Sequence, residues 1–244
     1  MSYDPQVLLA SVDQNMAQFT ALGTAAMVFN YIYFFTAIVN GRRDRAFTFP
    51  LVCSTIWFAH DLSYLLLYDQ WFHVYKHWYV ERFWYGLVPT TLFEIFFIYQ
   101  AWQYGKDEIM PKASRTAFTG YVLLAVVSGL VFWAALKYFL ADPIYAYAFG
   151  ATGVIAPIFV IARMLRRGDA KGQSVLLWAS YVGMQSSWFT ATILYFGPDF
   201  RTPWYLAMVA LSILGGVAAT ILCHRMKREA RIHDQHPGEL HPAH

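Results

Sequence analysis

The chain has 244 residues, of which 58% are hydrophobic and only 14% are charged. This composition excludes an ordinary soluble domain, in which about a quarter of the residues are charged, and is typical of an integral membrane protein. The net charge of +3 needs no nucleic-acid partner to explain it, because membrane topology accounts for where the basic residues fall.

Seven apolar segments of about 20 residues follow one another along the chain, each long enough to cross roughly 30 Å of hydrocarbon. Charged residues combined with glycine or proline interrupt the chain between them. The pattern predicts an all-α membrane protein in which residues 1–230 form one seven-helix domain and residues 231–244 form a disordered cytoplasmic tail. The predicted membrane helices cover approximately residues 21–40, 48–67, 84–103, 117–139, 144–165, 174–196 and 203–224.

Lysine and arginine residues lie mainly on one side of the predicted membrane. Of the 18, 14 fall in the C-terminal tail or in the loops after the first, third and fifth segments. Cytoplasmic loops are enriched in these residues, so the N-terminus is predicted outside and the C-terminus inside. We therefore expect an integral protein of a bacterial inner (cytoplasmic) membrane. The basic residues on the opposite side are Lys76, Arg82, Lys137 and Arg201.

Aromatic residues recur at spacings of three and four between the second and third segments. This spacing gives a short helix one apolar face, and tryptophan and tyrosine favour the headgroup level of a membrane. We predict an outside helix over about residues 70–82 that lies on the membrane surface. It either caps a site that opens on this side or forms an aromatic belt.

Two stretches, residues 45–66 and 171–192, carry the same order of features at an offset of 126 residues. Each has a basic residue, a small hydroxyl side chain, an apolar run and a central polar pair, and His60 and Asp61 correspond to Ser186 and Ser187. The repeat predicts a 3+1+3 arrangement, in which two parallel three-helix units flank a linking helix and a site lies between the halves.

Ionisable residues interrupt the second and third segments near their midpoints. An aspartate at the centre of a bilayer costs roughly 2.5–3.5 kcal/mol, so such residues have a function or a partner. Asp61 and Glu94 belong to adjacent antiparallel helices and could meet. His60 points about 100° away from Asp61 around the same helix. We predict Asp61, Glu94 and His60 as catalytic residues; polar contacts between helices are the alternative.

Polar and aromatic residues on the same or neighbouring segments are candidates for substrate binding. Aromatic rings stabilise cations without attacking them, and 46 residues of the chain are aromatic. A carboxylic acid in a dry aromatic cavity suits carbocation chemistry on an isoprenoid that enters from the lipid. No metal-ligand spacing occurs in the segments, so we expect no metal and no cofactor. The candidate binding residues are Trp57, Tyr64, Asn30, Tyr31, Thr90, Tyr181, Gln185, Ser186 and Trp188.

The chain resembles the small seven-helix integral-membrane terpene cyclases of meroterpenoid and indole-terpenoid biosynthesis. The resemblance rests on the size, the seven segments, and the basic loop GRRDRAF before a helix in which Tyr64 follows Asp61 by three residues. It implies that an acid in this helix protonates an epoxide or a terminal alkene to start cyclisation. That family usually has Glu preceded by Trp there and a second acid in the last helix, whereas here Asp61 follows His60 and Glu94 is the remaining acid.

Other functions fit the same residues. Isomerisation, hydration or dehydration of an allylic terpene alcohol passes through the same type of cation. The 3+1+3 layout also looks like that of PQ-loop and SWEET-type transporters, whose repeated helices end in a Pro-Gln motif. The Pro-Gln pair here, Pro5-Gln6, lies outside the predicted membrane segments. A sensor or scaffold subunit is a third alternative. The expected partners are the lipid bilayer and a lipophilic, isoprenoid-like molecule.

Overall fold

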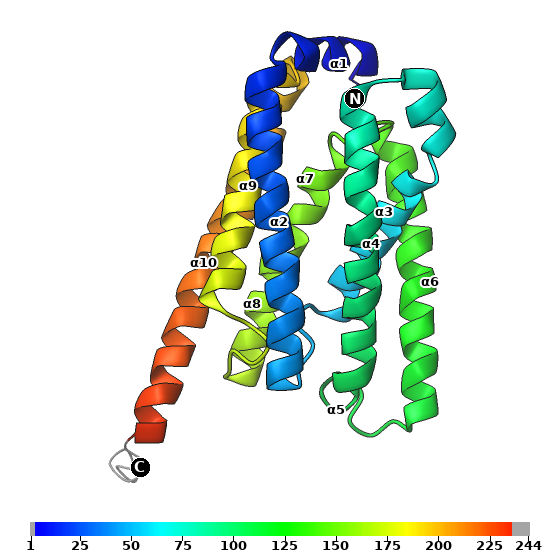
Figure 1. Ribbon diagram of the computed structural model, residues 1–244. Coiled ribbons are helices and arrows are strands. Elements are labelled where there is room, and N and C mark those ends of the chain that lie inside the picture. Colours follow the sequence, from blue (N-terminus) through cyan, green and yellow to red (C-terminus); the bar gives the residue numbers. More distant parts are fainter. Residues whose placement is uncertain (1–2, 236–244) are drawn as a thin grey trace.

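The computed structural model describes residues 3–235, and these residues form an all-α bundle (Figure 1). Within this part of the chain, seven helices have 13 residues or more and run along the bundle axis. Shorter elements connect them or lie across one end. The long helices are α2 (Met16–Asp44), α3 (Leu51–Leu65), α4 (Trp78–Tyr104), α6 (Arg115–Leu140), α8 (Ile155–Arg167), α9 (Val175–Tyr195) and α10 (Pro203–Gln235); the short elements are α1 (Pro5–Gln14), η1 (Gln70–Tyr75), α5 (Lys106–Ile109), α7 (Ala148–Gly153) and η2 (Pro198–Arg201).

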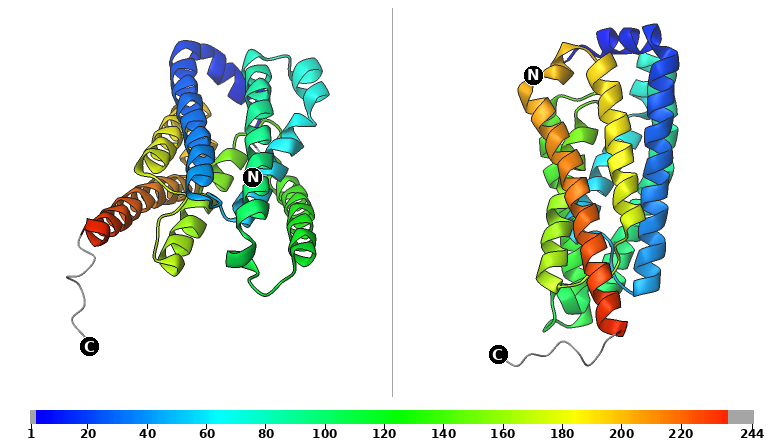
Figure 2. Two further views of the ribbon diagram at one scale, coloured as in Figure 1. Left: turned by 60° about the horizontal axis from the view of Figure 1, so that its bottom comes forward. Right: turned by 90° about the vertical axis from the view of Figure 1, so that its left-hand side faces the viewer.

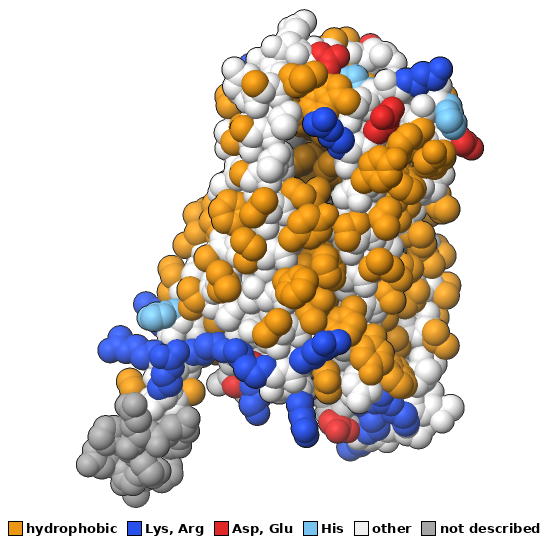
Figure 3. All heavy atoms as spheres, viewed as in Figure 1, with side chains coloured by type: hydrophobic (Ala, Val, Ile, Leu, Met, Phe, Trp, Pro, Cys, Tyr) orange, Lys and Arg blue, Asp and Glu red, His pale blue; other side chains and the backbone are white. Residues whose placement is uncertain are grey.

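The surface and the helix lengths are those of a membrane protein. Apolar side chains cover the middle of the face shown in Figure 3, and basic side chains gather mainly toward its lower end. Such a broad exposed apolar surface is unfavourable in water and suits lipid. The all-α membrane class is confirmed, whereas the seven-span topology and its orientation stay predictions. In the described residues, four stretches are long and apolar enough to cross a membrane: Met16–Asp44, Arg115–Leu140, Ala148–Arg167 and Pro203–Ile232.

The long helices pack in two groups, which meet where α2 contacts α4 and where α3 contacts α7 and α8. Helix α2 runs along α9, while α10 packs on α8 and α9, and α3 lies between α4 and α6 (Figures 1 and 2). With 15 residues, α3 is only about 22 Å long, shorter than a bilayer core. Ten of its residues are buried, His60 and Asp61 among them. Helix α3 is therefore an interior helix, and its polar side chains face protein instead of lipid.

The segment before α4 differs from the predicted surface helix. A single helix over residues 70–82 is wrong, because the chain makes the π-helical turn η1 and then breaks at Lys76, whose backbone is left-handed with φ 50°. The side chain of His77 then accepts a hydrogen bond from the backbone N–H of Tyr79 at 3.2 Å. This cap starts α4 at Trp78, six residues before the predicted start of the third membrane helix.

The predicted helix over residues 144–165 is also wrong in its first part. Residues 141–147 form a loop that enters the bundle, and the helix is divided into α7 and α8. The four residues from Ile144 to Tyr147 are almost completely buried although they are not helical. A buried loop needs partners for its backbone N–H groups. The Ile144 N–H donates to the Tyr3 hydroxyl at 3.3 Å, and one side chain accepts from the last two loop residues.

Asp142 holds this loop. Its carboxylate accepts backbone hydrogen bonds from Ala146 at 2.8 Å, Tyr147 at 2.8 Å and Ala148 at 2.7 Å. The hydroxyl of Tyr3 donates to the same carboxylate, which joins the N-terminal segment to the loop. The Asp142 side chain thus replaces the first helical turn and fixes the direction in which residues 143–147 face.

The first and last helices, α1 and α10, add to the two ends of the bundle. Helix α1 lies across one end of it, with Leu8, Leu9 and Val12 buried (Figure 1). The carboxylate of Asp13, just inside its last turn, accepts a hydrogen bond from the Trp78 indole at 2.7 Å. At the other terminus α10 continues to Gln235, five residues into the predicted disordered tail. The rest of that tail, residues 236–244, lies outside the described residues.

An ion cluster closes the opposite end of the bundle. The guanidinium of Arg163 is 6% exposed and donates two hydrogen bonds of 2.8 Å to Glu108 of α5, from Nε and Nη2. Arg166 and Arg167 also contact this carboxylate. Since an unpaired buried guanidinium is costly, Glu108 stabilises the junction of α5 with α8.

We expect Asp142→Asn to lower the free energy of unfolding by about 3 kcal/mol, because an amide replaces a charged acceptor of several hydrogen bonds. Thermal unfolding in detergent measures the effect as a lower midpoint. Asp69→Asn is the matched control, since the Asp69 side chain is 95% exposed. An unchanged midpoint for Asp142→Asn would show that the loop does not depend on this carboxylate.

The ionisation of Glu108 makes the stability of the protein depend on pH. Burial alone raises the pKa of Glu108, but hydrogen bonds and charge from Arg163, with Arg167 and Arg166, outweigh burial and hold the pKa below its usual 4.5. A carboxyl group whose pKa is lower in the folded than in the unfolded protein stabilises the fold at pH values above its unfolded-state pKa. This stabilisation is lost as the pH falls through the folded-state pKa. Glu108→Gln is expected to lower the unfolding midpoint at pH 7 and to flatten its fall in acid. Parallel acid profiles for the two proteins would contradict this.

Candidate active site

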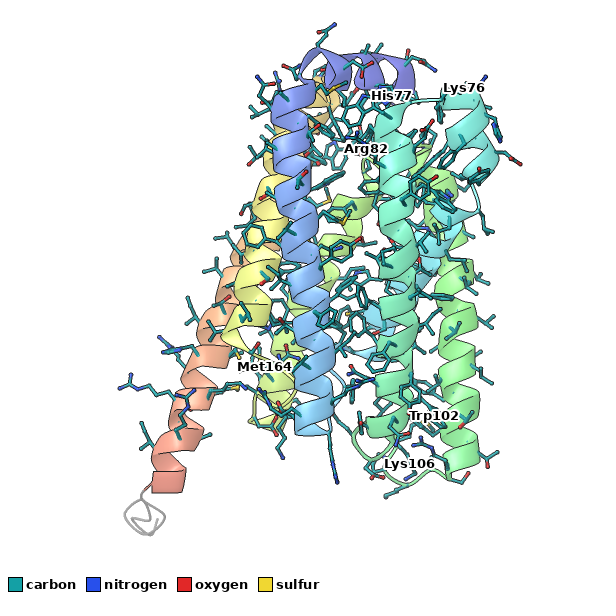
Figure 4. The ribbon with its side chains drawn as sticks, viewed as in Figure 1. Lys76, His77, Arg82, Trp102, Lys106 and Met164 are labelled. Atoms are coloured by element: carbon teal, nitrogen blue, oxygen red, sulfur yellow. The ribbon has the colours of Figure 1, made fainter. Side chains whose placement is uncertain are left out.

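A cavity of about 270 Å³ lies between α2, α3, α4, α7 and α9. Its volume is near the lower end of the roughly 300–1,000 Å³ common for small-molecule sites. Aromatic and aliphatic side chains form most of its wall, and Figure 4 shows side chains filling the space between α2 and α4. Two carboxyl groups, Asp61 and Glu94, line it. An apolar cavity with a few convergent polar groups has the character of a ligand or active site.

Asp61 is the centre of a buried hydrogen-bond network. Its Oδ2 accepts from the hydroxyl of Thr90 at 2.5 Å, and its Oδ1 accepts from the hydroxyl of Tyr145 at 2.7 Å. The Nδ1 atom of His60 lies 2.7 Å from Oδ1 and 2.8 Å from the Tyr145 oxygen, which closes a triangle. Donors around both oxygens suit the ionised carboxylate, which only accepts hydrogen bonds.

The spacing of residues along α3 and α4 places the polar groups of the site on shared helix faces. Trp57 and Asp61 are four residues apart on α3, and Thr90 and Glu94 are four residues apart on α4, so each pair occupies one helix face. Pro89 has no N–H and leaves the local helical hydrogen bonding incomplete. The hydroxyl of Thr90 also lies 3.0 Å from the carbonyl oxygen of Leu87, one turn earlier. The α4 face is thereby polar at the depth of Asp61.

Glu94 differs from Asp61 in its surroundings. Its side chain is 2% exposed, and among the described residues its Oε2 atom has no hydrogen-bond partner. It lines the same cavity as Asp61, and the two carboxyl groups are close enough to interact electrostatically. One carboxyl is therefore enclosed by donors, while its neighbour keeps an oxygen available to a ligand.

Further buried polar atoms of the cavity wall have no partner within residues 3–235. Leaving such an atom unsatisfied costs about 1–3 kcal/mol, so the wall favours a ligand that carries polar groups on an apolar body. Within the same residues, no three His, Cys, Asp or Glu side chains gather as a metal site would require. The unpartnered wall atoms are His60 Nε2, Tyr33 Oη, Tyr79 Oη, Gln185 Oε1 and Trp188 Nε1.

Nine of the twelve residues that the sequence singles out line this cavity. His60 and Asp61 face it together despite their angular separation on α3, because His60 bonds to Asp61 instead of to a neighbouring backbone carbonyl. Their catalytic and binding roles stay predictions. The nine are Asn30, Trp57, His60, Asp61, Thr90, Glu94, Tyr181, Gln185 and Trp188.

Three predicted binding residues do not line the cavity. Tyr31 follows Asn30 on α2 and is turned about 100° from it, so its ring packs toward Phe93. Ser186 is likewise turned away from its neighbour Gln185 on α9. Tyr64 is buried, but its hydroxyl donates to the backbone carbonyl of Asp142 at 3.0 Å. Tyr64 supports the loop that carries Tyr145 and does not contact the cavity directly.

Tyr145 is the main site residue that sequence reasoning missed. The predicted membrane helix over residues 144–165 leaves no reason to choose it among its apolar neighbours. Its phenol reaches Asp61 because the loop held by Asp142 turns it inward, with a left-handed backbone at φ 69°. The sequence signal was the Asp142-Pro143 pair, an acid and a helix breaker at the start of an apolar segment.

The sequence matches the family of Pyr4-like transmembrane terpene cyclases over residues 10–222. The matched region includes every residue that lines the cavity. No curated protein and no solved structure matches the chain.

We expect Tyr145→Phe to destabilise the protein by about 1–3 kcal/mol, because it removes the hydroxyl shared by Asp61 and His60 and leaves both buried groups with one partner fewer. Thermal unfolding in detergent measures the change. Tyr138→Phe removes the same atom from a residue that is 81% exposed and should have no effect. Equal midpoints for the two variants would show that the triangle contributes nothing to stability.

Proposed function

The chain belongs to the family of Pyr4-like transmembrane terpene cyclases, and from this membership we propose that it cyclises an isoprenoid in the cavity by proton-initiated carbocation chemistry without an added cofactor. The observation that carries the proposal is the pairing of two unlike carboxyl groups. Asp61 is surrounded by donors, and Glu94 presents an oxygen that has no partner among the described residues. Family membership favours this enzyme over the transporter and the sensor.

The two acids take different roles in the proposal. Two adjacent carboxyl groups in a dry site do not both ionise, because the second negative charge is repelled by the first and poorly solvated. Asp61 holds the negative charge, since Thr90 and Tyr145 donate to it. Glu94 holds the proton and is the general acid. His60 and Tyr145 act through Asp61 as positioning residues.

The reaction balances without a cofactor. Glu94 transfers its proton to a terminal alkene carbon or to an epoxide oxygen, and the resulting electron-deficient carbon is attacked by the π electrons of the next double bond, which forms a ring bond. The final carbocation loses a proton from a neighbouring carbon to a carboxylate of the Asp61–Glu94 pair. Transfer within the pair restores Glu94. The product has the mass of the substrate, because one proton is taken up and one is released.

Aromatic rings around the acids support a cationic intermediate. Trp57 and Trp188 line the cavity, as does Phe83, whose ring centroid is 4.8 Å from that of Tyr145 and 5.5 Å from that of Trp188. A desolvated cation over such a ring gains on the order of 2 kcal/mol. The rings also exclude water, which limits capture of the cation as an alcohol. Isomerisation or hydration of a terpene alcohol would use the same groups.

The proposed membrane placement follows the basic residues. Seven spans would be formed by α2, α3, α4, α6, the α7–α8 pair, α9 and α10. The basic side chains that gather at the lower end in Figure 3 would face the cytoplasm, with the C-terminus on that side. Helix α1 would lie outside a bacterial inner membrane. This placement puts the α1 end of the cavity in the outer leaflet, where an isoprenoid can enter from lipid.

Purified protein, incubated without metal or nucleotide with terpene alcohols and prenyl epoxides, is expected to give a product of unchanged mass by gas chromatography and mass spectrometry. Glu94→Gln and Asp61→Asn should each reduce turnover by about 10²–10⁴-fold, the usual contribution of general acid–base catalysis. Glu81→Gln and Asp69→Asn are matched controls outside the cavity.

Full activity in Asp61→Asn or Glu94→Gln would contradict the acid-pair mechanism. A water-shifted product mass would indicate hydration or dehydration instead of cyclisation. Loss of activity on adding a chelator would contradict catalysis without a cofactor.

A further inference from the structure

One stripe of α4 connects the two ends of the cavity. Tyr79, Arg82, Gly86, Thr90 and Glu94 recur at intervals of three or four residues, and all of them line the cavity. Arg82 and Glu94 are 12 residues apart, which corresponds to about 18 Å along the helix. The acid pair therefore lies at one end of the stripe and a guanidinium near the other, toward α1. Figure 4 shows Arg82 between the upper parts of α2 and α4.

Arg82 is an exposed residue whose charge is not neutralised within the described part of the chain. Among the described residues no carboxylate lies within ion-pair distance of it, and its guanidinium carbon lies 5.2 Å from the centre of the Trp78 ring. The Asp13 carboxylate at this end is bound by the Trp78 indole at 2.7 Å and by His77 at 3.1 Å. In contrast, Arg163 at the opposite end of the bundle has its carboxylate.

The part of the cavity wall formed by the first turns of α2 leaves room for a headgroup. Thr20, Gly23 and Thr24 of α2 line the cavity there, and a methyl group added at Gly23 would meet no atom within 4 Å. The hydroxyls of the two threonines can donate to an anion. A basic side chain, two hydroxyls and open space thus lie at one end of the cavity, and the acid pair lies farther along it.

We propose that Arg82 binds the anionic headgroup of a linear prenyl substrate, a phosphate, diphosphate or carboxylate, while the chain runs along the α4 stripe to Glu94 and Asp61. This inference rests on the proposed function and names its substrate class. A guanidinium is suited to phosphate and carboxylate because its N–H groups match two oxygens at once. The headgroup is an anchor and stays on the product, because the acids act about 18 Å away from it.

The distance between Arg82 and Glu94 along α4 determines the length of the prenyl chain that fits between them. The cavity has a volume of about 270 Å³, and about 18 Å of helix axis separates Arg82 from Glu94. At about 1.25 Å of length per carbon–carbon bond in a zigzag, the span corresponds to roughly 14 carbon atoms. Prenyl chains of three or four isoprene units, with 12 or 16 carbons in the main chain, bracket this length.

Binding of farnesyl phosphate and of farnesol, measured by quenching of tryptophan fluorescence in neutral detergent, tests the proposal. Arg82→Gln should weaken farnesyl phosphate about tenfold or more and change farnesol less than about twofold, because only the ionic contact is lost. Arg82→Lys should give an intermediate value. Lys76→Gln, an exposed basic residue of the same end that does not line the cavity, should change neither.

Three outcomes would overturn the inference. Equal weakening of both ligands in Arg82→Gln would assign Arg82 a packing role. An unchanged affinity for farnesyl phosphate would exclude the ionic contact. Competition with farnesyl phosphate by phosphatidylglycerol but not phosphatidylcholine, lost in Arg82→Gln, would show that the site binds a lipid headgroup.

Binding and turnover are measured separately, so that the headgroup site can be tested apart from the proposed reaction. Binding is measured in Glu94→Gln protein, in which the proposed reaction is blocked. Arg82-dependent binding of farnesyl phosphate without turnover of any prenyl compound in the wild type would support the headgroup site and contradict the cyclase mechanism. Turnover of farnesol, together with an affinity for farnesyl phosphate that does not depend on Arg82, would support the cyclase mechanism and contradict the headgroup site.

Discussion

The carboxylate of Asp142 is the contact on which the rest of the site depends. Backbone N–H groups cannot be left unpaired inside a membrane protein, so a loop can enter the bundle only where its amides are satisfied. Asp142 accepts from the loop amides of Ala146 and Tyr147 and from that of Ala148 at the start of α7, and so allows residues 143–147 to cross the interior as a loop. The loop is held from two further sides, because Tyr64 donates to the Asp142 carbonyl and the Trp71 indole donates to that of Pro143 at 3.0 Å. Tyr145 reaches Asp61 as a result.

Hydropathy and helical periodicity predict the features that depend on neighbouring residues in the sequence. The apolar runs predict the all-α membrane class, and the spacing of Trp57 and Asp61, or of Thr90 and Glu94, predicts which pairs share a face. Periodicity does not tell which of two adjacent residues faces inward, so Tyr31 and Ser186 are misplaced although Asn30 and Gln185 line the cavity. The contact between Tyr145 and Asp61 joins residues 84 positions apart, and no local pattern specifies it.

Helix breaks, and not helix length, give this bundle its site. Pro89 lacks the N–H of one helical hydrogen bond beside Thr90 in α4, the left-handed residue Lys76 ends η1 so that α4 can start at Trp78, and the loop before α7 replaces a helical turn. Each break lies beside a polar group of the cavity or beside its end. Aromatic side chains form much of the cavity wall, and Asp61 and Glu94 are buried within it. Irregular backbone is tolerated at this depth because protein surrounds it.

The bond between Tyr3 and Asp142 joins two parts of the chain that are synthesised at different times. The two residues are separated by 139 positions, so the N-terminal segment leaves the ribosome long before its partner does. Until the chain has been made past residue 148, the loop lacks its amide donors and Tyr145 has no fixed place beside Asp61. A nascent chain that already contains both acids therefore lacks the completed hydrogen-bond network around Asp61.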